Sequence, residues 1–192
     1  MYKRFARWCD NGVWERMLAH FADDPDMENG MIDTTIVRTH ACAAGAQKKA
    51  GGQAEQALGR SRGGFSTKIH VTVDGLGNPL RLRLTAGQRH DIIRATDMII
   101  DLDFEYVLAD RSYAAQHFID DIIAQGAEPV IPPKQNARRP RAYDEWRYRE
   151  RHLVECFIGK IKHFRRVFSR FDKLARRYLG FVQLASALIW LR

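Results

Sequence analysis

Apolar and polar side chains alternate in several short segments of the chain, and β-branched residues gather in the same places. This pattern predicts five strands, because alternation at a period of two is typical of a half-buried strand. The predicted strands fall at residues 30–37, 65–73, 79–85, 105–109 and 128–131. The glycine-rich stretch 74–78 joins the second and third of them as a hairpin.

Apolar residues recur at helical spacing between and after these strands. Helices are predicted at two places within 2–21, from 91 to 100, from 114 to 125, from 144 to 168 and from 172 to 190. Asp91 is expected to cap the first helix after the hairpin. From the first strand onward the order is β-β-β-α-β-α-β-α-α, which predicts an α/β fold with a mixed sheet flanked by helices. Residues 45–64 hold six glycines and predict a flexible loop.

Composition excludes a disordered chain or a coiled-coil rod, since 45% of the 192 residues are hydrophobic. The net charge of +8 is unevenly distributed along the chain. Residues 134–192 hold 16 Lys or Arg against 5 Asp or Glu, a net of +11, so residues 1–133 have a net of −3. This excess fits either a localised surface that binds a polyanion or a solvated basic helix face.

The three cysteines, Cys9, Cys42 and Cys156, are odd in number and form no C-x-x-C pair. Neither a disulfide framework nor a zinc site is expected from them. The first residues lack a signal peptide, and the apolar run 179–191 is too short to span a bilayer. We therefore expect a soluble cytoplasmic protein with no membrane partner.

Three carboxylates stand in positions that favour chemistry. Asp33 interrupts a strand predicted to be buried, where an unpaired charge costs several kcal/mol, on the order given for buried ions, unless a partner or metal compensates. Asp110 follows a short hydrophobic strand, where open α/β sheets place their ligands. Either aspartate alone fits a turn or cap equally well. Glu155 lies within the predicted helix 144–168.

Polar residues share one narrow face of that predicted helix. At about 100° per residue, this face holds Tyr148, Arg151, Glu155, Lys162 and Arg166. The opposite face is apolar and holds Leu153, Phe157, Ile161, Phe164 and Phe168. An amphipathic helix with intrahelical ion pairs explains the pattern as well as a functional site does.

The spacing Tyr148-x-x-Arg151-x-x-x-Glu155-x₆-Lys162 resembles the tyrosine–arginine–glutamate–lysine motif of DDE insertion-sequence transposases of the IS four and IS five groups. The segments 31–35 and 107–113 resemble the family's first-aspartate and second-aspartate motifs. Five more segments resemble the IS five type, at residues 59–64, 67–70, 84–88, 131–134 and 165–173. The resemblance covers residues 28–192.

The resemblance implies a ribonuclease H-like catalytic domain over residues 28–192, after a remnant (1–27) of an N-terminal helical DNA-binding region. It also implies that Asp33, Asp110 and Glu155 bind two Mg²⁺ ions, for which Mn²⁺ can substitute. Three carboxylates suit this role because hard divalent cations prefer oxygen ligands. The reaction would be DNA cleavage by water, followed by strand transfer from a DNA 3′-hydroxyl.

The resemblance implies that basic residues bind DNA beside the carboxylates. The resemblance implies that Arg151 and Lys162 contact phosphates and that Tyr148 contacts the DNA backbone. The residues expected to extend this track are Arg165, Arg166, Arg170, Arg138, Arg139 and Arg141.

Relatives have a longer N-terminal region, so the chain is expected to be either the second reading frame of an element that makes its enzyme by frameshifting or a truncated remnant. DNA is the expected partner, with a homodimer on DNA and a bacterial, nucleoid-associated location. A catalytically defective transposase that only binds DNA remains an alternative. A ribonuclease acting on an RNA–DNA hybrid is a third.

Overall fold

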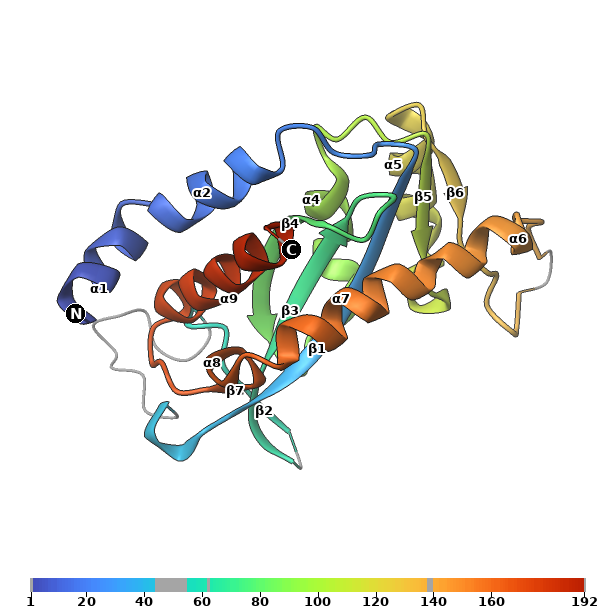
Figure 1. Cartoon of the computed structure of the whole chain (residues 1–192). Helices are drawn as coiled ribbons and strands as arrows, with labels where there is room; N and C mark the ends of the chain where they lie inside the picture. The colour runs from blue at the N-terminus through green and yellow to red at the C-terminus, as the bar shows by residue number, and fades with distance from the viewer. Residues whose placement is uncertain (1, 44–54, 62, 138–139, 192) are drawn as a thin grey trace.

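The computed structural model describes residues 2–43, 55–61, 63–137 and 140–191. Its described strands form one seven-stranded sheet (Figure 1). They are β1 (Asn29–Thr39), β2 (Gly59–Ser61), β3 (Gly64–Val73), β4 (Pro79–Ala86), β5 (Tyr106–Ala109), β6 (Glu128–Val130) and β7 (Ser169–Arg170).

The long strand β1 lies at the centre of this sheet and makes both kinds of pairing. It runs antiparallel to β3 on one side and parallel to β5 on the other. β5 is parallel to β6, and β3 is antiparallel to both β2 and β4. β7 pairs in parallel with the last residues of β1. The path β4–β3–β1–β5–β6 confirms the mixed sheet predicted from the order of elements.

Helices and short 3₁₀ turns connect the strands. Around the first strand they are α1 (Tyr2–Asp10), α2 (Val13–Phe21) and η1 (Ala41–Ala43). In the middle of the chain they are η3 (Asp91–Arg94), α4 (Ala95–Ile99), η4 (Arg111–Tyr113) and α5 (Gln116–Ala124). The last part holds α6 (Glu145–Tyr148), η5 (Arg149–Arg151), α7 (His152–Lys162), α8 (Arg165–Phe168) and α9 (Ala175–Trp190). Within the described ranges, every helix is too short or too polar to cross a membrane.

Each face of the sheet has its own hydrophobic core. On one face, Met31 and Val71 of the sheet pack with Val154 and Phe157 of α7 and with residues of α2 and α9. Figure 1 shows α7 lying along β1 and α9 beside it. On the other face, residues of β1 and β5 pack with α4 and α5. The sheet is therefore covered on both sides, and β1 is buried except near its far end.

The predicted helix 144–168 is wrong as one continuous helix. Asp144 caps its start by accepting the amides of Trp146 and Arg147, both at 2.9 Å. The helix ends at Lys162, because Phe164 adopts extended backbone angles before α8 begins. This break changes the phase of the helix, so Phe168 is 65% exposed although its spacing predicted a buried position.

Three further boundaries differ from the sequence prediction. Part of the predicted loop 45–64 is ordered, because residues 59–61 pair with β3 as the strand β2; residues 45–54 and 62 lie outside the described part. The last helix begins at residue 175 instead of 172, since β7 pairs with the end of β1 just before it. The helix predicted at 91–100 starts as a 3₁₀ turn and becomes α-helical only at residue 95.

The two predicted N-terminal helices are present and pack against α9. The ring of Phe5 stacks on Phe181 with centroids 4.1 Å apart. A Cβ at Gly180 would lie 2.6 Å from the sulfur of Cys9, so only glycine permits this close approach. The role of residues 1–27 as a remnant of a DNA-binding region stays a prediction.

Gly30→Ala is expected to destabilise the protein by about 1–3 kcal/mol, the usual penalty for overpacking a core. The added Cβ would lie 2.4 Å from the buried ring of Phe104. Gly159→Ala on α7 is the matched control, since nothing lies within 4 Å of its Cβ. It should stabilise the helix by roughly 0.5–1 kcal/mol. Urea unfolding measures both variants, and an unchanged midpoint for Gly30→Ala would contradict the packing.

Candidate active site

The register of β1 and β5 brings Asp33 and Asp110 side by side. Ile32 and Ala109 are the last paired residues of the two parallel strands, and the two aspartates follow them directly. Met31 and Leu108 are also paired and belong to the core beneath α7. Because side chains alternate along a strand, residues 33 and 110 are directed to that same face.

The pKa of Asp33 reflects its proximity to Asp110. Burial raises the pKa of Asp33, and the negative charge of Asp110 raises it further. The amide of Thr34, which donates to Asp33 Oδ1 at 2.7 Å, and the guanidinium of Arg151 act in the opposite direction. Two carboxylates at one end of the sheet therefore form a site that favours a cation.

Arg151 connects Asp33 to Glu155, the third predicted carboxylate. Its Nη1 lies 3.0 Å from Asp33 Oδ2, and its Nη2 forms an ion pair with Glu155 one helical turn further along. The Asp33 and Arg151 side chains are 18% and 17% exposed, whereas Glu155 is 55% exposed. The structure thus gathers all three predicted carboxylates around one end of the sheet, with Glu155 joined to the aspartates through a guanidinium.

The donor chemistry of this site fits a divalent cation. Among the described residues no group of three or more His, Cys, Asp or Glu side chains is close enough to hold a metal ion as it stands. Asp33 and Asp110 alone supply adjacent carboxylate oxygens, and Glu155 is held nearby by a side chain rather than by the backbone. Glu155 becomes available as a third ligand only if its ion pair with Arg151 opens.

A second polar cluster supports Asp33 from the other face of the sheet, and the sequence prediction missed it. The hydroxyl of Thr34 donates to Asp91 Oδ1 at 2.9 Å, and Lys68 forms an ion pair with the same carboxylate. The cap predicted for Asp91 is wrong, because its side chain bonds to two strands instead of to backbone amides. The signal available in the sequence was a lysine, Lys68, within the predicted strand 65–73.

The buried residue Tyr113 confirms that several carboxylates gather here. Burial raises the pKa of its phenol, and the negative charges of Asp91, Asp33 and Asp110 raise it further. Asp110 also accepts the amide of Ser112 at 2.8 Å, so it caps η4 as well as facing the site. A cap and a ligand role are compatible for this aspartate, since a carboxylate has two oxygens.

Two predicted DNA contacts, Tyr148 at the end of α6 and Lys162 at the end of α7, are partly exposed. Tyr148 packs edge-on against Tyr143 and lies 5.7 Å from the guanidinium of Arg151, so it helps to position that side chain. Lys162 is half-buried and makes no hydrogen bond or ion pair in the described structure. Its ammonium is therefore available to a phosphate.

Most of the other predicted DNA contacts lie away from this face or are already engaged. Arg166 lies 3.7 Å from Asp172 and over the ring of Phe181, so extension of the polar stripe to it is wrong because the helix breaks before it. Arg165 stacks near Phe171. Arg141 is half-buried with a bond to a backbone carbonyl, and residues 138 and 139 lie outside the described part.

Arg170 has no exposed surface, so a place for it on a DNA-binding surface is wrong. Its guanidinium donates to Thr67 Oγ1 at 2.6 Å and to backbone carbonyls beyond β7. Burial lowers its pKa to about 10. The side chain therefore bonds β7 to β3 and to the segment before α9 inside the protein, and it does not face solvent.

Residues 24–190 match the model of the transposase DDE domain family. The chain belongs to this family. The match includes Asp33, Asp110 and Glu155, and it confirms the DDE transposase predicted from the sequence; assignment to the IS four or IS five group stays a prediction. Membership makes this chain an enzyme of DNA transposition that depends on a divalent metal.

Individual relatives agree with the family. The chain is 38% identical over 131 residues to a Brucella ovis protein assigned as the transposase for insertion sequence element IS6501, covering 67% of this chain and all of that protein. It is 47% identical over 55 residues to protein y4sN of Sinorhizobium fredii, covering 29% of this chain and 44% of that protein. The catalytic domain of Mos1 mariner transposase has a TM-score of 0.37 and 12% identity, covering all of this chain and 92% of that one, too low a similarity to support an argument.

Asp33→Asn is expected to raise the melting temperature at pH 7 in the presence of a chelator. Because the pKa of Asp33 is raised in the folded protein, its ionised form destabilises the fold at every pH above that value. The gain from the substitution should therefore shrink as the pH falls through the folded pKa, and it should vanish below the ordinary value of 3.8. Thermal unfolding across this pH range measures the effect.

The matched control is Asp103→Asn, at an exposed aspartate that makes no hydrogen bond or ion pair within the described residues. It should leave the melting temperature unchanged at each pH. A lower melting temperature for Asp33→Asn at pH 7 would contradict the buried, unfavourable charge.

Proposed function

We propose that Asp33, Asp110 and Glu155 are the metal-binding carboxylates with which this transposase cleaves DNA and joins strands. The observation that carries this assignment is the parallel register of β1 and β5, which places two aspartates side by side below the helix that holds the glutamate. All three acidic positions are present and face one site, which favours an active enzyme over a defective DNA-binding remnant.

Mg²⁺ is the metal we propose, in a pair that Mn²⁺ can replace, because all three ligands are hard carboxylate oxygens. When bound, such ions activate an attacking oxygen and stabilise the leaving oxygen of a phosphodiester. Asp33 and Asp110 would hold them from the sheet, and Glu155 would do so from α7. The pairing of β1 with β5 brings the two aspartates together, so Glu155 and its ion-pair partner Arg151 are the side chains that would rearrange.

In this scheme a DNA phosphate competes with the carboxylates of Asp33 and Glu155 for the guanidinium of Arg151. In the described structure Arg151 neutralises Asp33 and Glu155. A DNA phosphate at the site would offer it a stronger bidentate acceptor once cations occupy the carboxylates. Arg151 would thereby hold the scissile strand, with Tyr148 beside it and Lys162 two turns further along α7. Arg141, Arg165, Arg166 and residues 138 and 139 remain proposed contacts with more distant DNA.

The assembly that we propose is a homodimer on the two ends of an element, working on DNA in the bacterial nucleoid. A polypeptide from an upstream reading frame would supply recognition of those ends. Both proposals rest on the family and on the basic last third of the chain, whose residues 134–192 have a net charge of +11.

Asp33→Asn, Asp110→Asn and Glu155→Gln are each expected to reduce Mg²⁺-dependent nicking of a duplex by at least about 1,000-fold, because metal-assisted chemistry contributes several kcal/mol. DNA affinity should stay within about threefold, since none of the three side chains donates to phosphate. Gel analysis of labelled DNA measures nicking, and fluorescence anisotropy measures binding.

Asp103→Asn serves as the matched control and should nick at the wild-type rate. Nicking that survives all three site substitutions would overturn the assignment of the carboxylates. Loss of nicking together with loss of DNA binding in every variant would instead indicate a structural role for these residues.

Lys162→Gln should weaken duplex binding several-fold and lower the slope of log K against log salt by about 1, as expected when one phosphate contact is lost. Lys160→Gln is the control on the same helix, because a residue two positions away points to another face. Anisotropy titrations between low and moderate salt measure both variants. Equal effects of the two substitutions would show general attraction without a specific contact at residue 162.

A further inference from the structure

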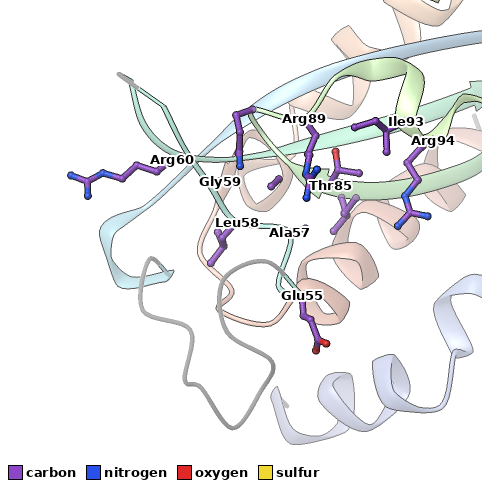
Figure 2. A pocket seen from close by; sticks show the side chains of 12 residues that line it. Glu55, Ala57, Leu58, Gly59, Arg60, Thr85, Arg89, Ile93 and Arg94 are labelled. Carbon is purple, nitrogen blue, oxygen red and sulfur yellow. The ribbon is translucent and has the colours of Figure 1, made fainter.

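A cavity of about 650 Å³ opens at the outer edge of β4, away from the carboxylates (Figure 2). Asp33 pairs with Val71, which pairs with Leu82, whereas Thr85 lies three residues further along β4. At about 4.8 Å between strands and 3.4 Å per residue, the Cα atoms of Asp33 and Thr85 are about 14 Å apart. The cavity is thus a separate site on the same sheet.

Parts of two segments that resembled the transposase family meet in this cavity, Gly59 and Arg60 of 59–64 and residues of 84–88, although the carboxylate site uses neither segment. A Cβ at Gly59 would lie 1.5 Å from Gln88 Oε1 and 2.9 Å from the amide nitrogen of Gly87. Gly59 therefore lets β2 approach the end of β4, and that approach forms one wall of the cavity. A Cβ at Gly87 would lie 2.1 Å from Ser66 Oγ of β3, so Gly87 permits a close approach to that strand.

The polar lining of the cavity is mainly cationic. Arg89 and Arg94 come from the segment after β4, and Arg60 extends outward from β2 (Figure 2). Arg94 forms an ion pair with Asp97, whereas Arg60 and Arg89 have no acidic partner among the described residues. Glu55 is the single acidic residue in the described lining. The cavity therefore attracts an anion.

The rest of the lining is aliphatic. Leu58 and Leu84 lie on the β2 and β4 sides, and Ile93 is 51% exposed beside the arginines. A site of several hundred Å³ with apolar walls and a few charged groups suits an organic anion better than a bare phosphate. β4 also pairs with β3 alone among the described strands, so its outer edge offers unpaired backbone groups.

We propose that this cavity binds one unpaired nucleotide of a DNA strand. Its phosphate would lie against Arg89, and its base or sugar against Leu84 and Ile93. A concave site suits a single strand, because a nucleotide in a duplex keeps its base stacked and out of reach. The choice of DNA as the ligand rests on the transposase function. The cavity and its positive charge are observed independently of that function.

The cavity is also connected to the carboxylate site. Lys68 Nζ donates to the backbone carbonyl of Arg89 at 2.7 Å and forms an ion pair with Asp91. Asp91 in turn accepts from Thr34, the neighbour of Asp33. A strand bound at Arg89 is thereby held at a fixed distance from the carboxylates.

The test measures binding of a labelled single strand of about ten nucleotides, in the presence of a chelator, by fluorescence anisotropy. Arg89→Gln should lose single-strand affinity by about tenfold, since hydrogen bonds between charged groups are the strong ones. Its duplex affinity should fall by less than about threefold. Arg38→Gln, at an exposed arginine on β1 outside the cavity, is the charge-matched control and should change neither affinity by more than about twofold.

A second pair of variants tests whether the bound strand passes beside Ile93. Ile93→Glu should weaken single-strand binding as strongly as the arginine variant, whereas Ile93→Gln should weaken it much less, because only the glutamate repels phosphate. The side chain is exposed, so both variants should fold. Cross-linking of a strand that contains 5-iodo-deoxyuridine should label peptides that include residues 84–94.

Several outcomes would overturn the proposal. They are equal losses for the arginine variant and Arg38→Gln, equal losses for single-strand and duplex DNA, or cross-links confined to α7. Asp110→Asn separates this proposal from the previous one, since it should abolish nicking but leave single-strand binding intact. Nicking that persists in Asp110→Asn would contradict the carboxylate assignment and leave the cavity proposal standing.

Discussion

The parallel register of β1 and β5 places two carboxylates side by side where both strands reach the end of their pairing. Two adjacent negative charges, one of them mostly buried, are unfavourable without a cation, as the raised pKa of Asp33 reflects. Arg151 supplies that cation from η5, just before α7. The side-chain positions of Arg151 and Glu155 therefore depend on the same charge balance that a divalent metal would satisfy.

Packing around this site is divided between the two faces of the sheet. Hydrophobic contacts of α7 with β1 and β3 hold the helix, so the ion pairs of Arg151 only need to orient side chains. On the opposite face, the Asp91 carboxylate accepts a hydrogen bond from Thr34, which follows Asp33 on β1, and forms an ion pair with Lys68 of β3. These bonds hold the backbone beside Asp33. Rigid strands with one adjustable helical ligand form a suitable frame for a metal that must also admit DNA.

Basic residues in the last third of the chain serve different purposes, although they look alike in the sequence. Arg170 is fully buried and closes the sheet through backbone carbonyls, and Arg166 faces Asp172. Arg147 lies over the ring of Tyr106 and pairs with Glu28, so it fastens α6 to the start of β1. Lys162 is left free of such contacts. A count of positive charge therefore overstates the surface available to DNA.

The sequence by itself determined the mixed fold, the positions of the central strands and the three carboxylates, because alternation, glycine-rich turns and motif spacing are local properties. Only the tertiary structure decided the phase of residues 163–168, since a break after Lys162 depends on how α8 and β7 pack against β1. It also decided that Asp91 bonds across the sheet and that Gly59 and Arg60 meet the end of β4. Such contacts join distant segments, and no periodicity within either segment records them.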